Sequence, residues 1–370
     1  MKVLLCTTTF RDISNGPTKF ARFLYQKCDG SNGLEVHILS EDIFEEDIRL
    51  YGCKVGFLKK VLPLAPVYRM IKYYLKSKKI DKIHQFDYVI YNNAVYGVIH
   101  AFYKPNIIGM INDYINQRNI SPGLNYSYIK KTIFKYFEKK AVSYSKLILT
   151  NSDFLNKELS NAFPKGANKF FRLYKGVKIN EEWPKNDSYW NAEDATPVKI
   201  LFVKNDFITG GIQILAESLS LIGLQFIVTV VGPDLQYGSQ IRSYFKSPNV
   251  TLNFQGRQSQ NSVFEYMSNH HIFCVPSLQE ALGVANLEAL NAGIPVVSSD
   301  AGGIPEALDY GGCGFLSEAG NALSLSDALK DCIYQKEARG SKVLNGFEYV
   351  KKFKADFIPG NLIKILNGKV

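Results

Sequence analysis

The sequence lacks any cysteine pattern of the kind that binds a metal or builds a disulfide framework. Its six cysteines are scattered over 370 residues and form no CxxC pair. Zinc sites and disulfide scaffolds of secreted proteins both need characteristic cysteine spacings. We therefore interpret the cysteines as reduced, mostly buried residues of a cytosolic protein.

Long apolar runs are also missing. No segment approaches the eighteen or so apolar residues that a membrane-spanning helix needs. The apolar start, MKVLLC, is too short for a secretory signal, and it ends at Thr7–Thr9, which Arg11 follows shortly afterwards. We predict a cytoplasmic protein, either soluble or held peripherally at the inner face of the membrane.

Acidic residues are scarce in one half of the chain only. Residues 1–196 carry 30 basic and 19 acidic residues, whereas residues 197–370 carry 14 and 15. The stretches Phe57 to Lys82 and Tyr126 to Lys146 interleave lysines with aromatic and aliphatic residues, which suits helices that lie on an anionic membrane surface. The alternative is a solvated helix face whose apolar side packs in the core. The neutral second half favours surface binding, and without a nucleic-acid-binding signature we expect no nucleic-acid partner.

Short apolar strands alternate with helical patterns through both halves of the sequence. They include predicted strands at 88–91, 147–150, 226–231 and 272–275 and a predicted helix from Ile208 to Gly223. This alternation predicts an α/β protein with two doubly wound parallel sheets. The length allows two domains of ordinary size. We place a first domain at residues 1–180, a second at 181–350 and a C-terminal helix at 351–370, with a polar linker over 178–196.

The stretch from His271 to Glu306 reads as one βαβ unit. An apolar strand over 272–275 precedes a helix that should begin near Gly283 and end at Gly293, and a second strand covers 295–299. Ligands of such sheets bind beyond the carboxyl ends of the strands, and the free N–H groups of Gly283 and Val284 would suit a phosphate.

Two carboxylates bracket this helix start. Glu280 lies in the loop and would face the part of the ligand that is attached beyond the phosphate. Glu288 lies one to two turns inside the helix, where it could accept hydrogen bonds from a ribose diol. The alternative is that Glu280 is an N-terminal helix charge and that Glu288 is a solvated surface residue.

The same stretch carries a motif of prolines, glycines, acidic and small apolar residues at fixed spacing: Pro276, Ser277, Glu280, Glu288, Ala289, Gly293, Pro295, Val296, Val297, Gly302, Gly303 and Glu306. With this motif it resembles the family 4 retaining glycosyltransferases of the GT-B fold, as bacterial surface-glycan enzymes exemplify. The resemblance implies two Rossmann-like domains facing across a cleft, with the C-terminal helix crossing back to the first. It implies that Glu280 contacts donor-sugar hydroxyls, that Glu288 holds the nucleotide ribose, and that the amides of Leu282, Gly283 and Val284 hold the diphosphate.

Further positions match the family with differences. Asn15 and Gly16 correspond to its glycine-rich loop beside the reaction centre, although a single glycine on its own favours an ordinary strand-to-helix turn. Asn112 and Asp113 stand where the family often has His-Asp, so an amide would take the place of the histidine at the catalytic centre.

Gly210 stands where the family has a lysine that neutralises the leaving diphosphate. A fixed cation there can lower the barrier by several kcal/mol. The candidates to replace it are Lys204 and Arg257.

The resemblance implies a retaining, metal-independent transfer with no cofactor, the nucleotide sugar being a co-substrate. We favour a UDP-sugar donor, with a GDP-sugar as the alternative. The basic first domain predicts a glycan or lipid-linked acceptor at the inner membrane face, as in bacterial polysaccharide or glycoconjugate synthesis. A GT-B sugar epimerase and a noncatalytic nucleotide-sugar or membrane-binding module are the alternatives.

Overall fold

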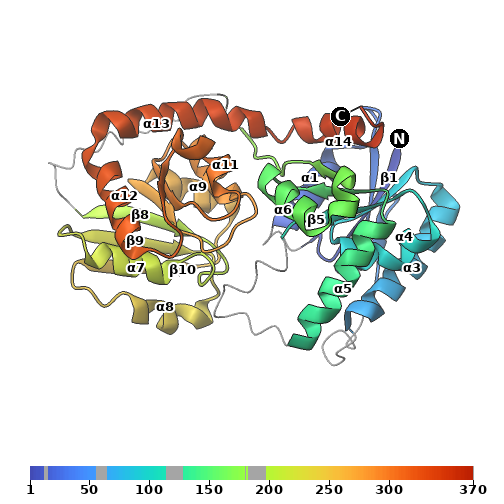
Figure 1. The fold of residues 1–370 in the computed structure, drawn as a ribbon, viewed down its shortest axis with the longest axis horizontal. Helices are drawn as coiled ribbons and strands as arrows, with labels where there is room; N and C mark the ends of the chain where they lie inside the picture. The colour runs from blue at the N-terminus through green and yellow to red at the C-terminus, as the bar shows by residue number, and fades with distance from the viewer. Residues whose placement is uncertain (12–15, 56–64, 114–127, 180, 182–196, 370) are drawn as a thin grey trace. The chain divides into compact units, whose positions relative to one another are not determined.

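The computed structural model describes residues 1–11, 16–55, 65–113, 128–179, 181 and 197–369. These residues form two compact units, each of which is described by itself (Figure 1). The first unit contains the described residues up to Gly176 together with 356–369, and the second contains those from Val177 to Ala355. Asn15, residues 57–64 of the first basic stretch and most of the expected linker lie outside the described residues.

The first unit is built on a seven-stranded parallel sheet of order β3-β2-β1-β4-β5-β6-β7. Its strands are short and rich in Val, Ile and Leu, as expected of strands covered on both faces. The strands are β1 (Lys2–Thr7), β2 (Glu35–Ser40), β3 (Leu50–Gly52), β4 (Tyr88–Tyr91), β5 (Ile107–Ile111), β6 (Leu147–Thr150) and β7 (Phe170–Arg172). The helices are α1 (Gly16–Lys27), α3 (Ala65–His84), α4 (Val98–Tyr103), α5 (Tyr128–Tyr144), α6 (Asp153–Ala162) and α14 (Phe357–Leu366).

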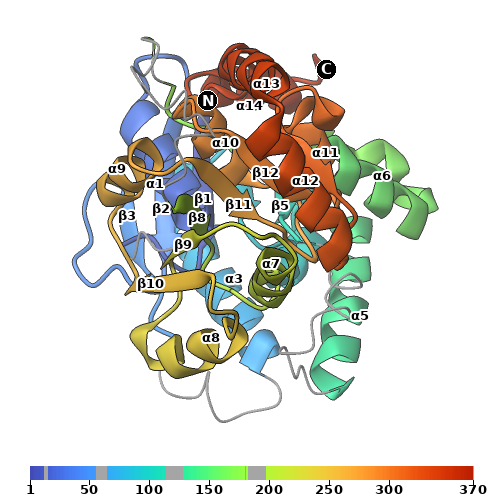
Figure 2. The same ribbon diagram turned by 90° about the vertical axis from the view of Figure 1, so that its left-hand side faces the viewer.

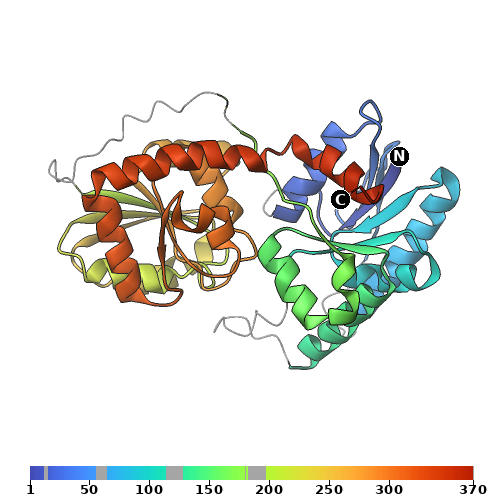
Figure 3. The ribbon, with the colours of Figure 1, turned by 45° about the horizontal axis from the view of Figure 1, so that its top comes forward.

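Helix α14 belongs to the first unit although it follows the whole second unit in the chain. It lies beside α1, as Figure 3 shows in red and blue. The Tyr88 hydroxyl donates a hydrogen bond of 3.0 Å to the carbonyl oxygen of Leu366, and this bond ties the end of α14 to β4. The expected return of the C-terminal helix to the first domain is thereby confirmed.

The second unit contains a six-stranded parallel sheet of order β10-β9-β8-β11-β12-β13. Helices α7, α8 and α12 lie along one face, and α9 and α10 along the other (Figure 2). The strands are β8 (Val198–Val203), β9 (Phe226–Val231), β10 (Val250–Gly256), β11 (Ile272–Val275), β12 (Val296–Ser299) and β13 (Phe315–Ser317). The helices are α7 (Ile212–Ser220), α8 (Gly238–Tyr244), α9 (Gln260–Ser268), α10 (Val284–Asn291), α11 (Ile304–Ala307), α12 (Ala322–Tyr334) and α13 (Lys336–Tyr349).

Both sheets reverse their strand order at one point. The reversal lies between β1 and β4 in the first unit and between β8 and β11 in the second. At such a switch point the connections leave in opposite directions, so a crevice opens beyond the carboxyl ends of the two strands. These two places are therefore where each unit is expected to bind a ligand.

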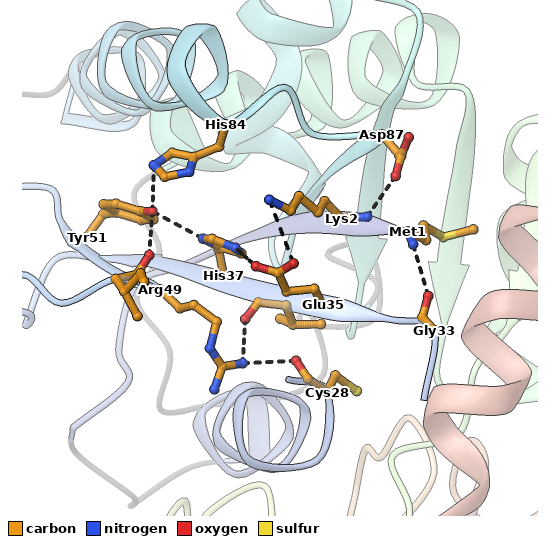
Figure 4. Close-up of polar contacts among 12 residues, drawn as sticks. Met1, Lys2, Cys28, Gly33, Glu35, His37, Arg49, Tyr51, His84 and Asp87 are labelled. Carbon is orange, nitrogen blue, oxygen red and sulfur yellow. Dashed lines mark hydrogen bonds and ion pairs between the residues drawn. The ribbon is translucent and has the colours of Figure 1, made fainter. Parts of the chain in front are cut away.

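A partly buried polar cluster lies among β2, β3 and the end of α3 (Figure 4). The Nε2 atom of His37 is 2.6 Å from a carboxylate oxygen of Glu35, and its Nδ1 atom is 3.1 Å from the hydroxyl of Tyr51. Tyr51 also contacts Nε2 of His84 at 3.0 Å. Burial lowers the pKa of His37 in spite of the neighbouring carboxylate. The cluster ties two strands to a helix, away from the carboxyl-end crevice.

Several predicted strands coincide with the observed ones, including 88–91, 147–150, 226–231 and 272–275. The helix expected from Ile208 begins only at Ile212, because Gly211 takes a left-handed conformation with φ of 75° just before it. The six cysteines are free and buried, as predicted. Among the described residues, no helix is both long and apolar enough to cross a bilayer.

Candidate functional site

The switch point of the second unit carries an ion pair. Lys204 directly follows β8, Glu280 lies in the loop after β11, and the Lys204 ammonium donates a hydrogen bond to the Glu280 carboxylate. Both side chains are 22% exposed, so the pair can be reached from solvent. Burial raises the pKa of Glu280, but the Lys204 ammonium and the N–H groups of Ala281 and Leu282 outweigh it and hold that pKa below its ordinary value. Glu280 is therefore an ionised acceptor with a fixed direction.

Glycines let two further loops lie directly against the loop of Glu280. Gly302 has φ of 60°, and a Cβ atom added to it would lie 1.9 Å from the carbonyl oxygen of Glu280. A Cβ atom on Gly303 would lie 2.2 Å from the carbonyl oxygen of Ala281. Gly211 approaches the carbonyl oxygen of Pro276 in the same way. Backbone contact this close is open only to glycine, so the Gly-Gly pair shapes the loop.

Helix α10 begins beside this carboxylate without a side-chain cap. Its N-cap is Gly283, with φ of 89°, and a Cβ atom there would lie 3.6 Å from Cγ of Glu280. The first N–H groups of a helix lack intrahelical partners and carry a partial positive charge. Leu282, Gly283 and Val284 are therefore placed at a helix start that suits an anion.

Glu288 lies one turn inside α10. It is half-buried, and its carboxylate accepts a hydrogen bond of 3.3 Å from the Gln260 amide at the start of α9. Gln260 is a neighbour that the sequence did not indicate, because the two helices meet only in the fold.

The space beside Gly210 is already occupied. A Cβ atom on Gly210 would lie 2.7 Å from the ring of Phe202 and 2.9 Å from Cγ of Lys204. The Lys204 stem thus fills the place into which a side chain from position 210 would project. The other candidate cation, Arg257, pairs with Asp234 instead, at 2.6 Å between Nε and Oδ1. Within the second unit, Lys204 is the candidate that contacts Glu280.

The switch point of the first unit is lined by amides and hydroxyls. The amide nitrogen of Asn92, which follows β4, lies 3.2 Å from the Thr7 hydroxyl at the end of β1. The amide nitrogen of Asn112, which follows β5, donates to the Asn92 carbonyl oxygen at 2.8 Å. The amide nitrogen of Asn151, which follows β6, donates to the Asn112 carbonyl oxygen at 3.3 Å. We call these three residues the asparagine ladder.

The ladder gives the predicted residue Asn112 a definite environment. Its amide nitrogen donates to the backbone and side-chain oxygens of Asn92, at 2.8 and 3.2 Å, so the amide predicted to replace the family's histidine is engaged within the ladder. Asp113 beside it is exposed. Gly16 forms the start of α1 and is exposed, with no atom within 4 Å of an added Cβ atom. Asn92 and Asn151 were missed as site residues, although each directly follows a buried strand.

In the part of the chain that the structure describes, no three His, Cys, Asp or Glu side chains come together as a metal-binding group. The candidate site of the second unit thus consists of a cation, a carboxylate and a helix start. This combination can bind a phosphorylated, hydroxyl-rich molecule.

Two doubly wound parallel-sheet units with a C-terminal helix that joins the first are the GT-B fold of glycosyltransferases. Solved structures of the same fold cover the whole chain. Sucrose-phosphate synthase of Thermosynechococcus elongatus aligns over 100% of both chains, with a TM-score of 0.81 and 17% identity. Anabaena HepE in complex with UDP-glucose also aligns over 100% of both chains, with a TM-score of 0.73 and 18% identity.

Sequence comparison relates the chain to glycosyltransferases. Residues 187–344 match the family model of glycosyl transferases group 1. An uncharacterised glycosyltransferase of Methanocaldococcus jannaschii is 26% identical over 328 residues, 86% of each chain. The lipopolysaccharide glucosyltransferase WaaG of Escherichia coli is 22% identical over 53% of this chain and 54% of its own. These comparisons support a group 1 glycosyltransferase.

Proposed function

We propose that the protein is a retaining, family 4 type glycosyltransferase that moves a sugar from a nucleotide-sugar donor to a glycan or lipid-linked acceptor. The observation that carries the proposal is the Lys204–Glu280 pair beside the uncapped start of α10. A UDP-sugar is the favoured donor, because UDP-glucose is the ligand named for the similar HepE structure. A GDP-sugar is the alternative.

Each group of the second-unit site has a role in the proposed reaction. The α10 amides bind the diphosphate, Glu288 accepts hydrogen bonds from the ribose, and Glu280 accepts them from sugar hydroxyls. The bond between the anomeric carbon and the diphosphate oxygen breaks, and the acceptor oxygen bonds to the same face of the sugar. The acceptor proton passes to the leaving phosphate, whose developing charge Lys204 stabilises. The reaction so written requires no metal and no cofactor.

The proposed acceptor side is the first unit, whose surface combines lysines with exposed apolar side chains. Leu75 and Ile83 on α3 are 57% and 69% exposed, and Phe102 and Tyr103 on α4 are 60% and 67% exposed. Lysines 78, 79 and 82 on α3 are exposed as well. Aliphatic and aromatic side chains among lysines suit the interface of an anionic membrane. This arrangement supports peripheral binding at the inner membrane face and a lipid-linked acceptor, as in bacterial surface-glycan synthesis.

The first experiment is a thermal-shift screen against UDP, GDP, ADP and CMP, followed by their sugar conjugates. Ligand at about a hundred times its dissociation constant should add about 2.7 kcal/mol to the free energy of unfolding. We expect UDP to give the selective shift. If no nucleotide shifts the melting temperature, the donor site as proposed is wrong.

Product analysis then separates the catalytic alternatives. With donor and an acceptor extract, a transferase yields a new α- or β-linked product of the same anomeric configuration as the donor, which NMR identifies. An epimerase instead releases or interconverts the sugar without an acceptor. Nucleotide binding without either product would favour the noncatalytic module.

A further inference from the structure

The second unit contains a polar groove that lies apart from the loop of Glu280. It has a volume of about 450 Å³ and lies between α9 and strands β8, β9 and β10, towards the amino ends of β8 and β9. This volume falls within the range of small-molecule sites, about 300–1,000 Å³. We call it the α9 groove. The residues that line it include Lys199, Ile227, Asn253, Glu265, Tyr266 and His270.

Strand register and helix spacing explain why these residues share one groove. Lys199 of β8 is the register partner of Ile227 of β9, and Asn253 of β10 is the partner of Thr229. Side chains two positions apart on a strand point to the same face, so the strand residues form one floor. On α9, Ser262 lies three and four residues before Glu265 and Tyr266, which places these side chains on one helix face. One sheet face and one helix face therefore meet here.

The wall of the groove is fixed by a buried histidine. His270 is 7% exposed, its Nδ1 atom is 2.6 Å from the carbonyl oxygen of Tyr266, and its Nε2 atom is 2.7 Å from the Thr229 hydroxyl. Its ring also contacts the Tyr266 ring edge-on, at 6.0 Å between centroids. The histidine thus holds the end of α9 against β9, so the Tyr266 wall is formed before any ligand arrives.

Several polar groups in the groove are not used by the fold. Among the described residues, the ammonium group of Lys199, the carboxylate of Glu265 and the hydroxyl of Tyr266 have no hydrogen-bond or ion-pair partner. The side chain of Asn253 accepts from Gln255, and this leaves its amide N–H groups for a ligand. The groove therefore offers donors and acceptors of both charge signs around one aromatic wall and one aliphatic floor.

We propose that the α9 groove binds a saccharide, separately from the nucleotide-sugar site. Sugar hydroxyls both donate and accept hydrogen bonds, so they can satisfy an ammonium, a carboxylate, a phenol and an amide together. The apolar ring face of a sugar can pack on Ile227 and Tyr266. An anion would meet Glu265 and a cation would meet Lys199, so a neutral, hydroxyl-rich ligand fits this surface best. Such a site would hold a glycan on the enzyme while the donor site turns over.

Methyl NMR of isoleucine-labelled protein tests the proposal directly. Ile227 forms the groove floor, whereas Ile304 lies near Gly283, with 3.5 Å between its Cγ1 atom and an added Cβ atom. Ile227→Val and Ile304→Val variants assign the two signals. Titration with maltose, sucrose or N-acetylglucosamine should shift Ile227 saturably and leave Ile304 unchanged. UDP should do the reverse, so failure of the groove and failure of the donor site are observed separately.

Variants of the groove, a control variant and competing ligands test whether the α9 groove binds saccharide specifically. Asn253→Ala removes the amide donors, and Glu265→Gln removes the charge of the acceptor; both positions are exposed. Each change should weaken saccharide binding about fivefold. Asn161→Ala, an exposed change on α6 of the first unit, should leave it unchanged. The proposal is overturned if no saccharide moves Ile227, if both groove variants bind saccharide as wild type does, or if inorganic phosphate moves Ile227 more strongly than every saccharide.

Discussion

The two switch points differ in charge although they occupy the same place in similar sheets. In the second unit, Lys204 and Glu280 form an ion pair where β8 and β11 end. In the first unit, Thr7 and Asn92 form a neutral contact where β1 and β4 end, and the asparagine ladder extends it to β5 and β6. The same topology thus carries a charged site in one unit and a neutral amide framework in the other.

This difference suggests that the two switch points have different roles, one in turnover and one in stability. Developing charge on a leaving group is stabilised by fixed charges and dipoles, which the second unit supplies. Neutral amides orient neighbouring loops without competing for a phosphate. The first unit carries exposed lysines on α3 and α5, whereas the side chains at its switch point are uncharged. The comparison predicts that charge changes act on turnover in the second unit, and that amide changes act on stability in the first.

The largest effect is expected from Glu280→Gln. The change removes a charge that is fixed beside the proposed donor sugar, and loss of one such group costs about 10²–10³-fold in turnover. Initial-rate kinetics with saturating donor measure it. Glu337→Gln, on the exposed start of α13, is the matched control and should keep wild-type turnover. Turnover within threefold of wild type would remove Glu280 from the site.

Gly302→Ala should act through the backbone and not through charge. Its Cβ atom would lie 1.9 Å from the Glu280 carbonyl oxygen at φ of 60°, so the loop must move. We expect a loss of about 2–4 kcal/mol in the free energy of unfolding, since the clash adds to a strain of about 1–3 kcal/mol. Gly340→Ala on α13 has open space and should be neutral or stabilising. Urea unfolding compares them, and equal midpoints would contradict the close packing.

Asn92→Ala tests whether the asparagine ladder stabilises the first unit. Asn92 is 4% exposed and bonds to Thr7, Pro17 and Asn112. Its loss leaves buried partners unsatisfied, at about 1–3 kcal/mol of the free energy of unfolding. Asn161→Ala on the exposed face of α6 should change it by less than about 0.5 kcal/mol. If the two variants unfold at the same urea concentration, the ladder does not stabilise the unit.

Lys82→Gln tests whether the surface charge of the first unit serves a membrane. One lysine near an anionic membrane contributes about 1 kcal/mol, so vesicle binding should weaken about fivefold. Co-sedimentation with phosphatidylserine vesicles at low salt measures it. Lys246→Gln in the second unit is the control and should have no effect. Equal binding of both variants would favour the solvated-face interpretation of α3.

The smallest effect is a pH dependence, because the Lys204–Glu280 pair is partly exposed to solvent. The pKa of Glu280 is lowered in the folded state, so its ionised form stabilises the fold. That stability is complete above the ordinary pKa of a glutamate, about 4.3, and is lost as the pH falls through the lower folded value. Urea unfolding from pH 7 to pH 3 should therefore decline less steeply in Glu280→Gln than in wild type. Parallel curves would contradict the pKa shift.

The sequence predicted the strands that form the centres of both sheets, because runs such as 226–231 are apolar enough to be buried on both faces. It missed β3, β7 and β13, which have three residues each and depend on a neighbouring strand. It located the loop of Glu280 from the βαβ pattern, and the family resemblance then assigned roles to its residues. It did not predict the asparagine ladder, because contacts among Asn92, Asn112 and Asn151 depend on strand order. Nor did it show that Lys204 fills the space at Gly210.

The placement of α14 has a consequence for biosynthesis. The described part of the second unit from residue 197 to Ala355 leaves the ribosome before the helix that completes the first unit. Domains generally fold as units during synthesis, the earlier one first. The first unit is an exception, because its last helix is synthesised after the second unit. The hydrogen bond from Tyr88 to Leu366 and the contact of α14 with α1 can form only after the second unit has been made. Nascent chains halted before residue 356 should therefore present a protease-sensitive first unit attached to a folded second one.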